Sequence, residues 1–239
     1  MKRIAALSCV LGFVILALAG CSSGPSSNDL AIQYMEEKYG ESFTYASAWG
    51  NSLYGNHELL VSCDSLPELV LVEIEDYRSE DRVFRDNYLA VKYADQTQQF
   101  IQDGANAVFG YAKVHYHVTR TGLSETLPTN VSFEEYLADQ RAELLPLIEV
   151  PQSNFSSREQ LFQMLDILTK YGTLYYGQVV IVEDDNFGKF SEDELETQMT
   201  TGEILGFNFK NLPNGTGIWE WTEDGVIEIT RSEEPALIE

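Results

Sequence analysis

Apolar residues recur near helical spacing in five segments of the chain, and capping residues or glycines bound most of these segments. Three of the segments open with a Ser-x-x-Glu or Ser-x-x-Gln pattern, which is typical of a capping box. A helix is therefore expected at Asp29–Tyr39 after a cap at Ser27 or Asn28, at Asn87–Phe109, after Ser132, from Ser157 to Gly172, and from Ser191 to Gly202.

Period-two alternation and short apolar runs predict the strands that lie between these helices. Expected strands are Phe43–Ala48, His57–Cys63, Glu68–Glu75, Lys113–Thr119 and Tyr175–Val182. Three more, at Ile204–Lys210, Gly217–Thr222 and Val226–Arg231, are separated by Asn-Gly and Asp-Gly dipeptides, which favour tight hairpins. The pattern predicts an α+β fold, in which short antiparallel sheets are packed by about five helices and the C-terminal strands form a three-stranded meander.

The first 21 residues have the order of an export signal. Lys2 and Arg3 precede an apolar run over residues 4–18, which is shorter than the roughly 20 residues that span a bilayer. The run ends in Leu18-Ala19-Gly20-Cys21, which resembles the lipobox of bacterial prolipoproteins at all four positions. This resemblance implies cleavage between Gly20 and Cys21, a diacylglycerol on the Cys21 thiol, and a protein held at the cell membrane and facing outside the cytoplasm.

The predicted organisation is a signal peptide at residues 1–20, a lipidated cysteine and tether at 21–28, and a soluble extracytoplasmic domain at 29–239. That domain is either one unit or two subdomains that divide near 120–131. Removal of residues 1–20, which hold two basic and no acidic residues, changes the formal charge from −23 to −25. Such a charge argues against nucleic acid as a partner, because phosphates require lysine and arginine.

Two histidines and one cysteine are candidates for chemistry. Alternation puts His115 and His117 on one face of a predicted strand, which supplies two of the three or four ligands that zinc needs. The alternative is an exposed polar face opposite Val114 and Tyr116, and the sequence favours it, so no metal or other cofactor is expected beyond the lipid. Cys63 would be the only cysteine after cleavage, and we expect it to be a small buried apolar residue rather than a nucleophile.

Two further motifs suggest ligand binding. Residues 183–188 resemble part of a calcium-binding loop, but Phe187 stands where a ligand is needed, so a plain strand-to-helix loop is expected. Trp219 and Trp221 share one face of a predicted strand. If they are exposed, they could stack on sugar rings or peptide, whereas burial, which the neighbouring apolar strand favours, would make them packing residues.

The motifs of serine hydrolases, dinucleotide-binding proteins, P-loop proteins and zincins are absent from the sequence. The segment from Ala31 to Val118 is similar to small uncharacterised lipoproteins of Gram-positive gut bacteria, through Tyr34–Gly40 and Val61–Pro67. That resemblance implies no activity. The leading hypothesis is a non-catalytic interaction or envelope-associated module, whose partners are the bilayer and an envelope protein. The alternatives are a cell-envelope hydrolase that uses acidic residues and a small-ligand-binding lipoprotein.

Overall fold

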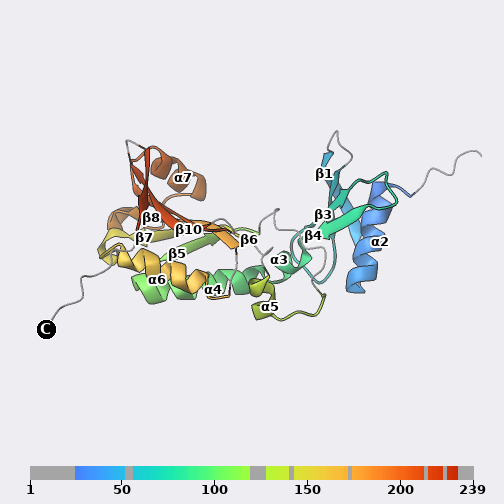
Figure 1. Ribbon diagram of the computed structural model, residues 1–239, viewed down its shortest axis with the longest axis horizontal. Helices are drawn as coiled ribbons and strands as arrows, with labels where there is room; N and C mark the ends of the chain where they lie inside the picture. Colours follow the sequence, from blue (N-terminus) through green and yellow to red (C-terminus); the bar gives the residue numbers. More distant parts are fainter. Residues whose placement is uncertain are drawn as a thin grey trace, which may run out of the picture.

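The computed structural model describes residues 25–51, 56–118, 128–139, 143–171, 174–212, 215–222 and 225–230. Two β-sheets lie at opposite ends of an elongated molecule and are joined by a helical connection (Figure 1). We call residues 25–86 the N-terminal lobe and residues 94–230 the C-terminal lobe. In the described part of the chain, no helix is both long enough and apolar enough to cross a membrane.

The N-terminal lobe packs one helix, α2 (Ser27–Tyr39), against a four-stranded antiparallel sheet. The helix starts early because Ser26, rather than Ser27 or Asn28, forms a capping box with Asp29, and it ends at Gly40, whose φ is 71°. Its buried side chains, Ala31 and Met35, face the sheet core. The strands follow the chain in order as β1 (Thr44–Asn51), β2 (His57–Ser62), β3 (Val70–Glu75) and β4 (Val83–Asp86).

Two helices carry the chain from the first sheet to the second. The short α3 (Tyr88–Lys92) follows β4 directly, and α4 (Ala94–Phe109) then runs beneath the second sheet (Figure 1). The expected single helix over Asn87–Phe109 is therefore interrupted at Tyr93, which has φ −101° and ψ 10°. Gly104 on α4 allows α6 (Glu159–Leu168) to approach closely, because an added Cβ would lie 2.9 Å from Ile167.

The C-terminal lobe is built on a seven-stranded mixed sheet with the order β11-β10-β9-β8-β7-β5, in which β6 pairs with β8. Its strands are β5 (Lys113–Tyr116), β6 (Glu143–Leu144), β7 (Pro146–Pro151), β8 (Leu174–Val182), β9 (Leu205–Leu212), β10 (Gly215–Thr222) and β11 (Gly225–Ile229). The helices between them are α5 (Phe133–Ala138), α6 (Glu159–Leu168) and α7 (Glu192–Thr200), with 3-10 turns η1 (Gln152–Asn154) and η2 (Asp184–Asn186).

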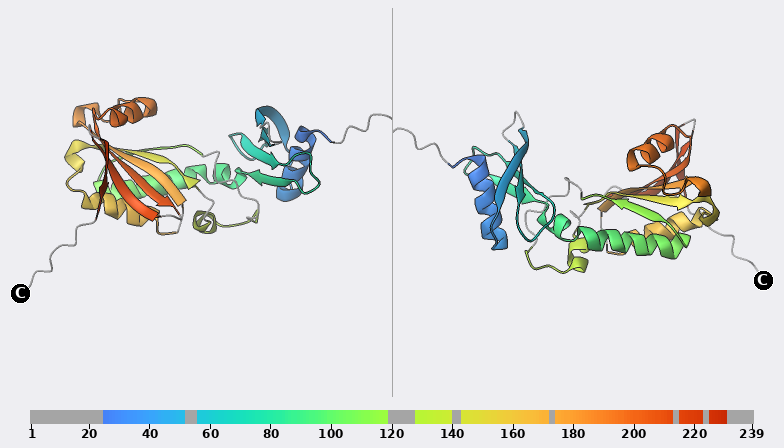
Figure 2. Two further views of the ribbon diagram at one scale, coloured as in Figure 1. Left: turned by 45° about the horizontal axis from the view of Figure 1, so that its top comes forward. Right: turned by 180° about the vertical axis from the view of Figure 1, so that it is seen from behind.

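The two faces of this sheet are covered unequally. Helices α4 and α6 lie along one face, and α7 lies over the outer end of the other (Figures 1 and 2). The larger core, on the α4 and α6 side, continues into the N-terminal lobe. A smaller core under α7 includes Leu195, Met199 and Val180. The face under α7 therefore buries fewer apolar side chains than the face under α4 and α6.

The α+β class and the C-terminal meander are confirmed. The capping boxes at Ser132 and Ser191 are confirmed, whereas Ser157 makes only half of one: Gln160 accepts from its backbone N–H, but the helix begins at Glu159 without a side-chain cap. The hairpin residues Asn214 and Asp224 lie outside the described residues.

Three features of the sheets differ from the prediction. Strands β4, β6 and β7 were not expected, because β4 carries two charged residues and prolines bound the run of β7. The second sheet is not purely antiparallel, since β7 and β6 both run parallel to β8. The two sheets divide within residues 87–112. The predicted subdomain boundary near 120–131 lies mostly outside the described residues and stays a prediction.

Candidate functional site

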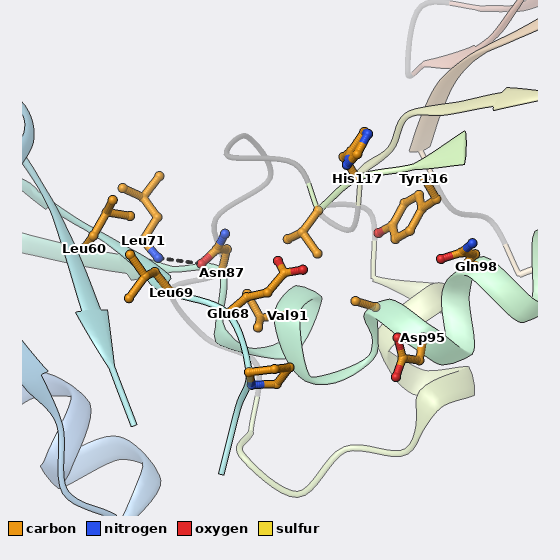
Figure 3. Close-up of a pocket in the computed structure, with 13 residues that line it drawn as sticks. Leu60, Glu68, Leu69, Leu71, Asn87, Val91, Asp95, Gln98, Tyr116 and His117 are labelled. Carbon is orange, nitrogen blue, oxygen red and sulfur yellow. Dashed lines mark hydrogen bonds between the residues drawn. The ribbon is translucent and has the colours of Figure 1, made fainter. Parts of the chain in front are cut away.

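A cleft of about 650 Å³ lies between the two lobes (Figure 3). Both sheets and the connecting helices contribute to its walls, so neither lobe could form it alone. We call this space the cleft; its lining residues are Leu60, Pro67, Glu68, Leu69, Leu71, Asn87, Val91, Ala94, Asp95, Gln98, Tyr116, His117 and Val118. The volume lies within the range of roughly 300–1,000 Å³ that is usual for small-ligand sites.

The position of the cleft follows from a contact between the start of α3 and strand β3. The side-chain oxygen of Asn87 accepts a hydrogen bond from the Leu71 backbone N–H at 2.7 Å, which fixes the start of α3 against β3. One turn later, Val91 is buried and lines the cleft floor. Leu69, just before β3, is 44% exposed at the rim. The apolar wall therefore comes from residues in or next to predicted strands and helices, and their pattern alone does not indicate a binding site.

Two polar groups point into the cleft from opposite lobes. The Glu68 carboxylate reaches in from the segment before β3, and the Tyr116 phenol reaches in from β5 (Figure 3). Tyr116 is 9% exposed, and its hydroxyl makes no hydrogen bond within the described residues. Burial raises the pKa of Tyr116 to about 12, and the charge of Glu68 adds to the rise. The phenol is therefore neutral at physiological pH and able both to donate and to accept.

The hydroxyl of Thr97 on α4 is the neighbour that could satisfy Tyr116. It lies close enough to lower the pKa of the phenol in part, yet neither hydroxyl meets a partner in hydrogen-bonding geometry. Because leaving a buried polar group unpaired costs about 1–3 kcal/mol, the fold gains nothing from this arrangement. The fold thus leaves one neutral donor and acceptor, the Tyr116 hydroxyl, on a residue that lines the cleft.

The described cleft lining is acidic. It contains two carboxylates, Glu68 and Asp95, and no lysine or arginine. Its histidine, His117, is 76% exposed and lies 2.6 Å from the Glu192 carboxylate at the start of α7. The cleft thus combines an apolar floor with negative charge at its polar positions.

A buried carboxylate lies behind the cleft, on the α7 side of the second sheet. Glu149 on β7 is fully buried, and its Oε1 accepts a hydrogen bond from the Gly188 backbone N–H at 2.6 Å. Its Oε2 lies 3.6 Å from Nε2 of His115, and in the described part of the chain neither atom has a hydrogen-bond partner. Glu149 therefore holds residues 183–191 over the sheet while one of its oxygens stays unsatisfied.

The N-terminal lobe buries a carboxylate in a different way. Asp86 is 3% exposed and accepts from the Tyr34 hydroxyl (2.7 Å), the Tyr39 hydroxyl (2.6 Å), the Lys38 ammonium (2.7 Å) and the Tyr88 backbone N–H (3.0 Å). Burial, and then the charge and hydrogen bond of Asp86, raise the pKa of Tyr39. With both oxygens satisfied, this cluster joins α2 to β4 and is a stabilising feature of the fold.

The two predicted histidines have different surroundings. The exposed polar face is right for His117, but it is wrong for His115, whose side chain is only 16% exposed beside Glu149. Val114, before His115, and Tyr116, between the two histidines, are buried as predicted. Each histidine faces one carboxylate, and no group of three metal-ligating side chains occurs within the described ranges.

The other candidate residues are not brought into the cleft lining. Cys63 follows β2, packs against the core and lies 3.4 Å from the Ser65 hydroxyl, but it is only partly buried and therefore less buried than expected. Residues 183–188 form a loop as expected, with Asp184 accepting from the Ser153 backbone N–H at 2.9 Å. Trp219 and Trp221 are both partly buried. Trp219 lies over Gly217, and Trp221 packs on the small core under α7.

Gly20 and Cys21 lie outside the described residues, so lipidation stays a prediction. Sequence reasoning missed Glu68, Tyr116 and Glu149, because among 38 acidic and 13 tyrosine residues nothing local distinguishes them. The chain matches no protein-family model, no curated protein and no solved structure.

Proposed function

We propose that the protein is a lipoprotein, anchored outside the cytoplasmic membrane through Cys21, and that it acts there as a non-catalytic binding module. The cleft between the lobes is its binding site. The observation that carries this proposal is the Tyr116 hydroxyl, which has no hydrogen-bond partner among the described residues, in a cleft of about 650 Å³ that both lobes line. The anchor rests on Leu18-Ala19-Gly20-Cys21 and the apolar segment before it.

Several features favour binding over catalysis. The described residues bury two carboxylates, Asp86 and Glu149, but these lie on different sheets and cannot share a proton or a substrate. The cleft carboxylates, Glu68 and Asp95, are both exposed. A carboxylate hydrolase needs two carboxyl groups that face one bond, in environments that separate their pKa values. A cleft with one unpaired phenol and an apolar floor fits a small ligand or a single side chain of a partner.

The anchor is tested by labelling cells with an alkyne fatty acid. The wild-type protein should carry the label and fractionate with membranes, because the buried acyl chains hold it there. Cys21→Ala should be unlabelled and either released or retained as a longer precursor. Cys63→Ala is the matched control and should be labelled like the wild type. Labelled Cys21→Ala would contradict the anchor.

The binding site is tested by photo-crosslinking in living cells from a single benzoylphenylalanine. Leu69, 44% exposed at the cleft rim, is the test position, and Val226, 50% exposed on β11, is its control away from the cleft lining. The proposal is supported if a crosslinked product forms from position 69 and not from position 226. This product should disappear in Gln98→Trp, which adds bulk to the cleft. Equal products from both positions, or none from position 69, would contradict it.

A further inference from the structure

The polar groups of the cleft define the charge of the ligand it would accept. Glu68 and Tyr116 come from different lobes and point into the same space (Figure 3). Asp95 and Gln98 line it from α4, and Leu69 and Val91 provide apolar surface. Among the described lining residues no lysine or arginine offsets the two carboxylates. An anion placed here would meet two carboxylates of like charge, whereas a cation would meet opposite charge.

We propose that the cleft selects an organic cation with an apolar body, such as a primary amine on an aryl or alkyl chain or the equivalent side chain of a peptide. This inference rests on the proposed function, since it names the chemical class of ligand for that cleft. The ammonium donates to the Glu68 carboxylate and to the Tyr116 hydroxyl oxygen, and the apolar body covers Leu69 and Val91. One ligand thereby satisfies the buried phenol and contacts both lobes.

The arrangement accounts for two observations together. The Tyr116 hydroxyl is buried without a hydrogen-bond partner among the described residues, which is unfavourable until a donor or acceptor occupies the cleft. Glu68 and Tyr116 point into the same space from different lobes, so one ligand in the cleft can contact both (Figure 3). Hydrogen bonds to charged groups are stronger than neutral ones, which gives an amine an advantage over an alcohol of the same shape.

The experiment uses three probes with one apolar body: 4-phenylbutylamine, 4-phenylbutanol and 4-phenylbutyrate. Their binding to the mature domain, residues 22–239, is followed by backbone-amide chemical shifts in about 0.15 M salt, which screens the overall charge of the chain. Amides of cleft residues should move, with the amine binding about five- to tenfold more tightly than the alcohol and the carboxylate most weakly. Glu68→Gln should abolish this amine preference and leave the alcohol unchanged. Glu228→Gln, which removes an equal charge on β11, should preserve it.

Three results would overturn the inference, and they separate it from the proposed function. If all three probes bind the cleft equally, the cleft is a binding site and its selectivity for cations is wrong. If Glu68→Gln and Glu228→Gln weaken the amine equally, the preference reflects overall charge alone, and the inference again fails by itself. If no probe moves a cleft amide at its solubility limit, both the inference and the assignment of the cleft as the binding site are contradicted.

Discussion

The two lobes each bury one carboxylate, and they treat it in opposite ways. Asp86 in the N-terminal lobe has four hydrogen-bond donors around its two oxygens, one of them a lysine. Glu149 in the C-terminal lobe has one backbone donor and leaves its second oxygen facing an equally unpaired imidazole nitrogen. Burial of charge is therefore not in itself a stabilising feature; the number of partners decides its effect on folding.

The same contrast extends beyond these two residues. The six buried side-chain atoms without a hydrogen-bond partner in the described residues all lie between residues 97 and 221. They belong to Thr97, His115, Tyr116, Glu149, Asn208 and Trp221. Tyr116 lines the cleft, Thr97 lies on α4, and the others lie on strands of the second sheet. The N-terminal lobe is thus organised for stability, and the C-terminal lobe retains polar groups that folding alone does not satisfy.

The largest expected effect comes from breaking the satisfied cluster. Asp86→Ala removes the acceptor that Tyr34, Tyr39 and Lys38 share, and breaking a buried ion pair on one side typically costs about 3–5 kcal/mol. Urea unfolding followed by circular dichroism measures the loss. Glu75→Ala, which breaks a partly exposed pair with Arg85 on the same sheet, is the control and should cost less than about 1 kcal/mol.

Alkaline pH should weaken the same cluster. Burial, and then Asp86, raise the pKa of Tyr39 above the value of about 10 that an unfolded tyrosine has. The stability that this shift provides is complete below pH 10 and is lost as pH rises, at about 1 kcal/mol per pH unit. Urea midpoints at pH 8 to 11 should show Tyr39→Phe less stable than wild type at pH 8 and converging with it above pH 10. A constant difference across that range would show that Tyr39 does not contribute to the pH dependence.

Neutralising the unsatisfied carboxylate should have a small effect or stabilise the protein. Glu149→Gln keeps an oxygen that accepts from Gly188 and removes a buried charge, so its unfolding free energy should lie within about 1 kcal/mol of wild type or above it. The isosteric companion Asp86→Asn, which leaves the Lys38 ammonium beside a neutral amide, should lose at least about 2 kcal/mol. Equal losses of unfolding free energy in Glu149→Gln and Asp86→Asn would contradict the difference in hydrogen bonding that we assign to the two buried carboxylates.

The smallest effect is expected at the edge of the cleft. His117→Gln breaks the contact with Glu192, but the histidine is 76% exposed, so the change in unfolding free energy should be below about 0.5 kcal/mol. Chemical denaturation at low and high salt measures it. A loss above 1 kcal/mol would mean that this pair holds α7 in place.

Local features of the fold could be predicted from the sequence, and long-range ones could not. The capping boxes at Ser132 and Ser191 depend on four consecutive residues, and both form. The strand Leu174–Val182 follows from its own apolar run. The break between α3 and α4 at Tyr93 could not be predicted, because no proline or glycine stands there. Strand β7 was missed because its run contains Glu149, a charged residue whose burial depends on Gly188 far along the chain.

The cleft depends entirely on such distant contacts. Glu68 and Tyr116 are 48 positions apart in the sequence, and each stands in a segment whose pattern indicates only a strand. They line one cleft because α3 and α4 connect the two lobes beside it. The histidines, by contrast, were identified from their spacing, and this pattern could not distinguish His115, which is mostly buried, from His117, which is exposed.

The most direct test of the central claim is the affinity of Tyr116→Phe for 4-phenylbutylamine, with its unfolding free energy as the control. The phenol makes no hydrogen bond to any residue that the structure describes, so its removal should leave stability within about 1 kcal/mol of wild type. The same change should weaken the amine several-fold, because it removes a group that only the ligand satisfies. Lost stability with unchanged affinity would instead make Tyr116 a structural residue and contradict the cleft as a binding site.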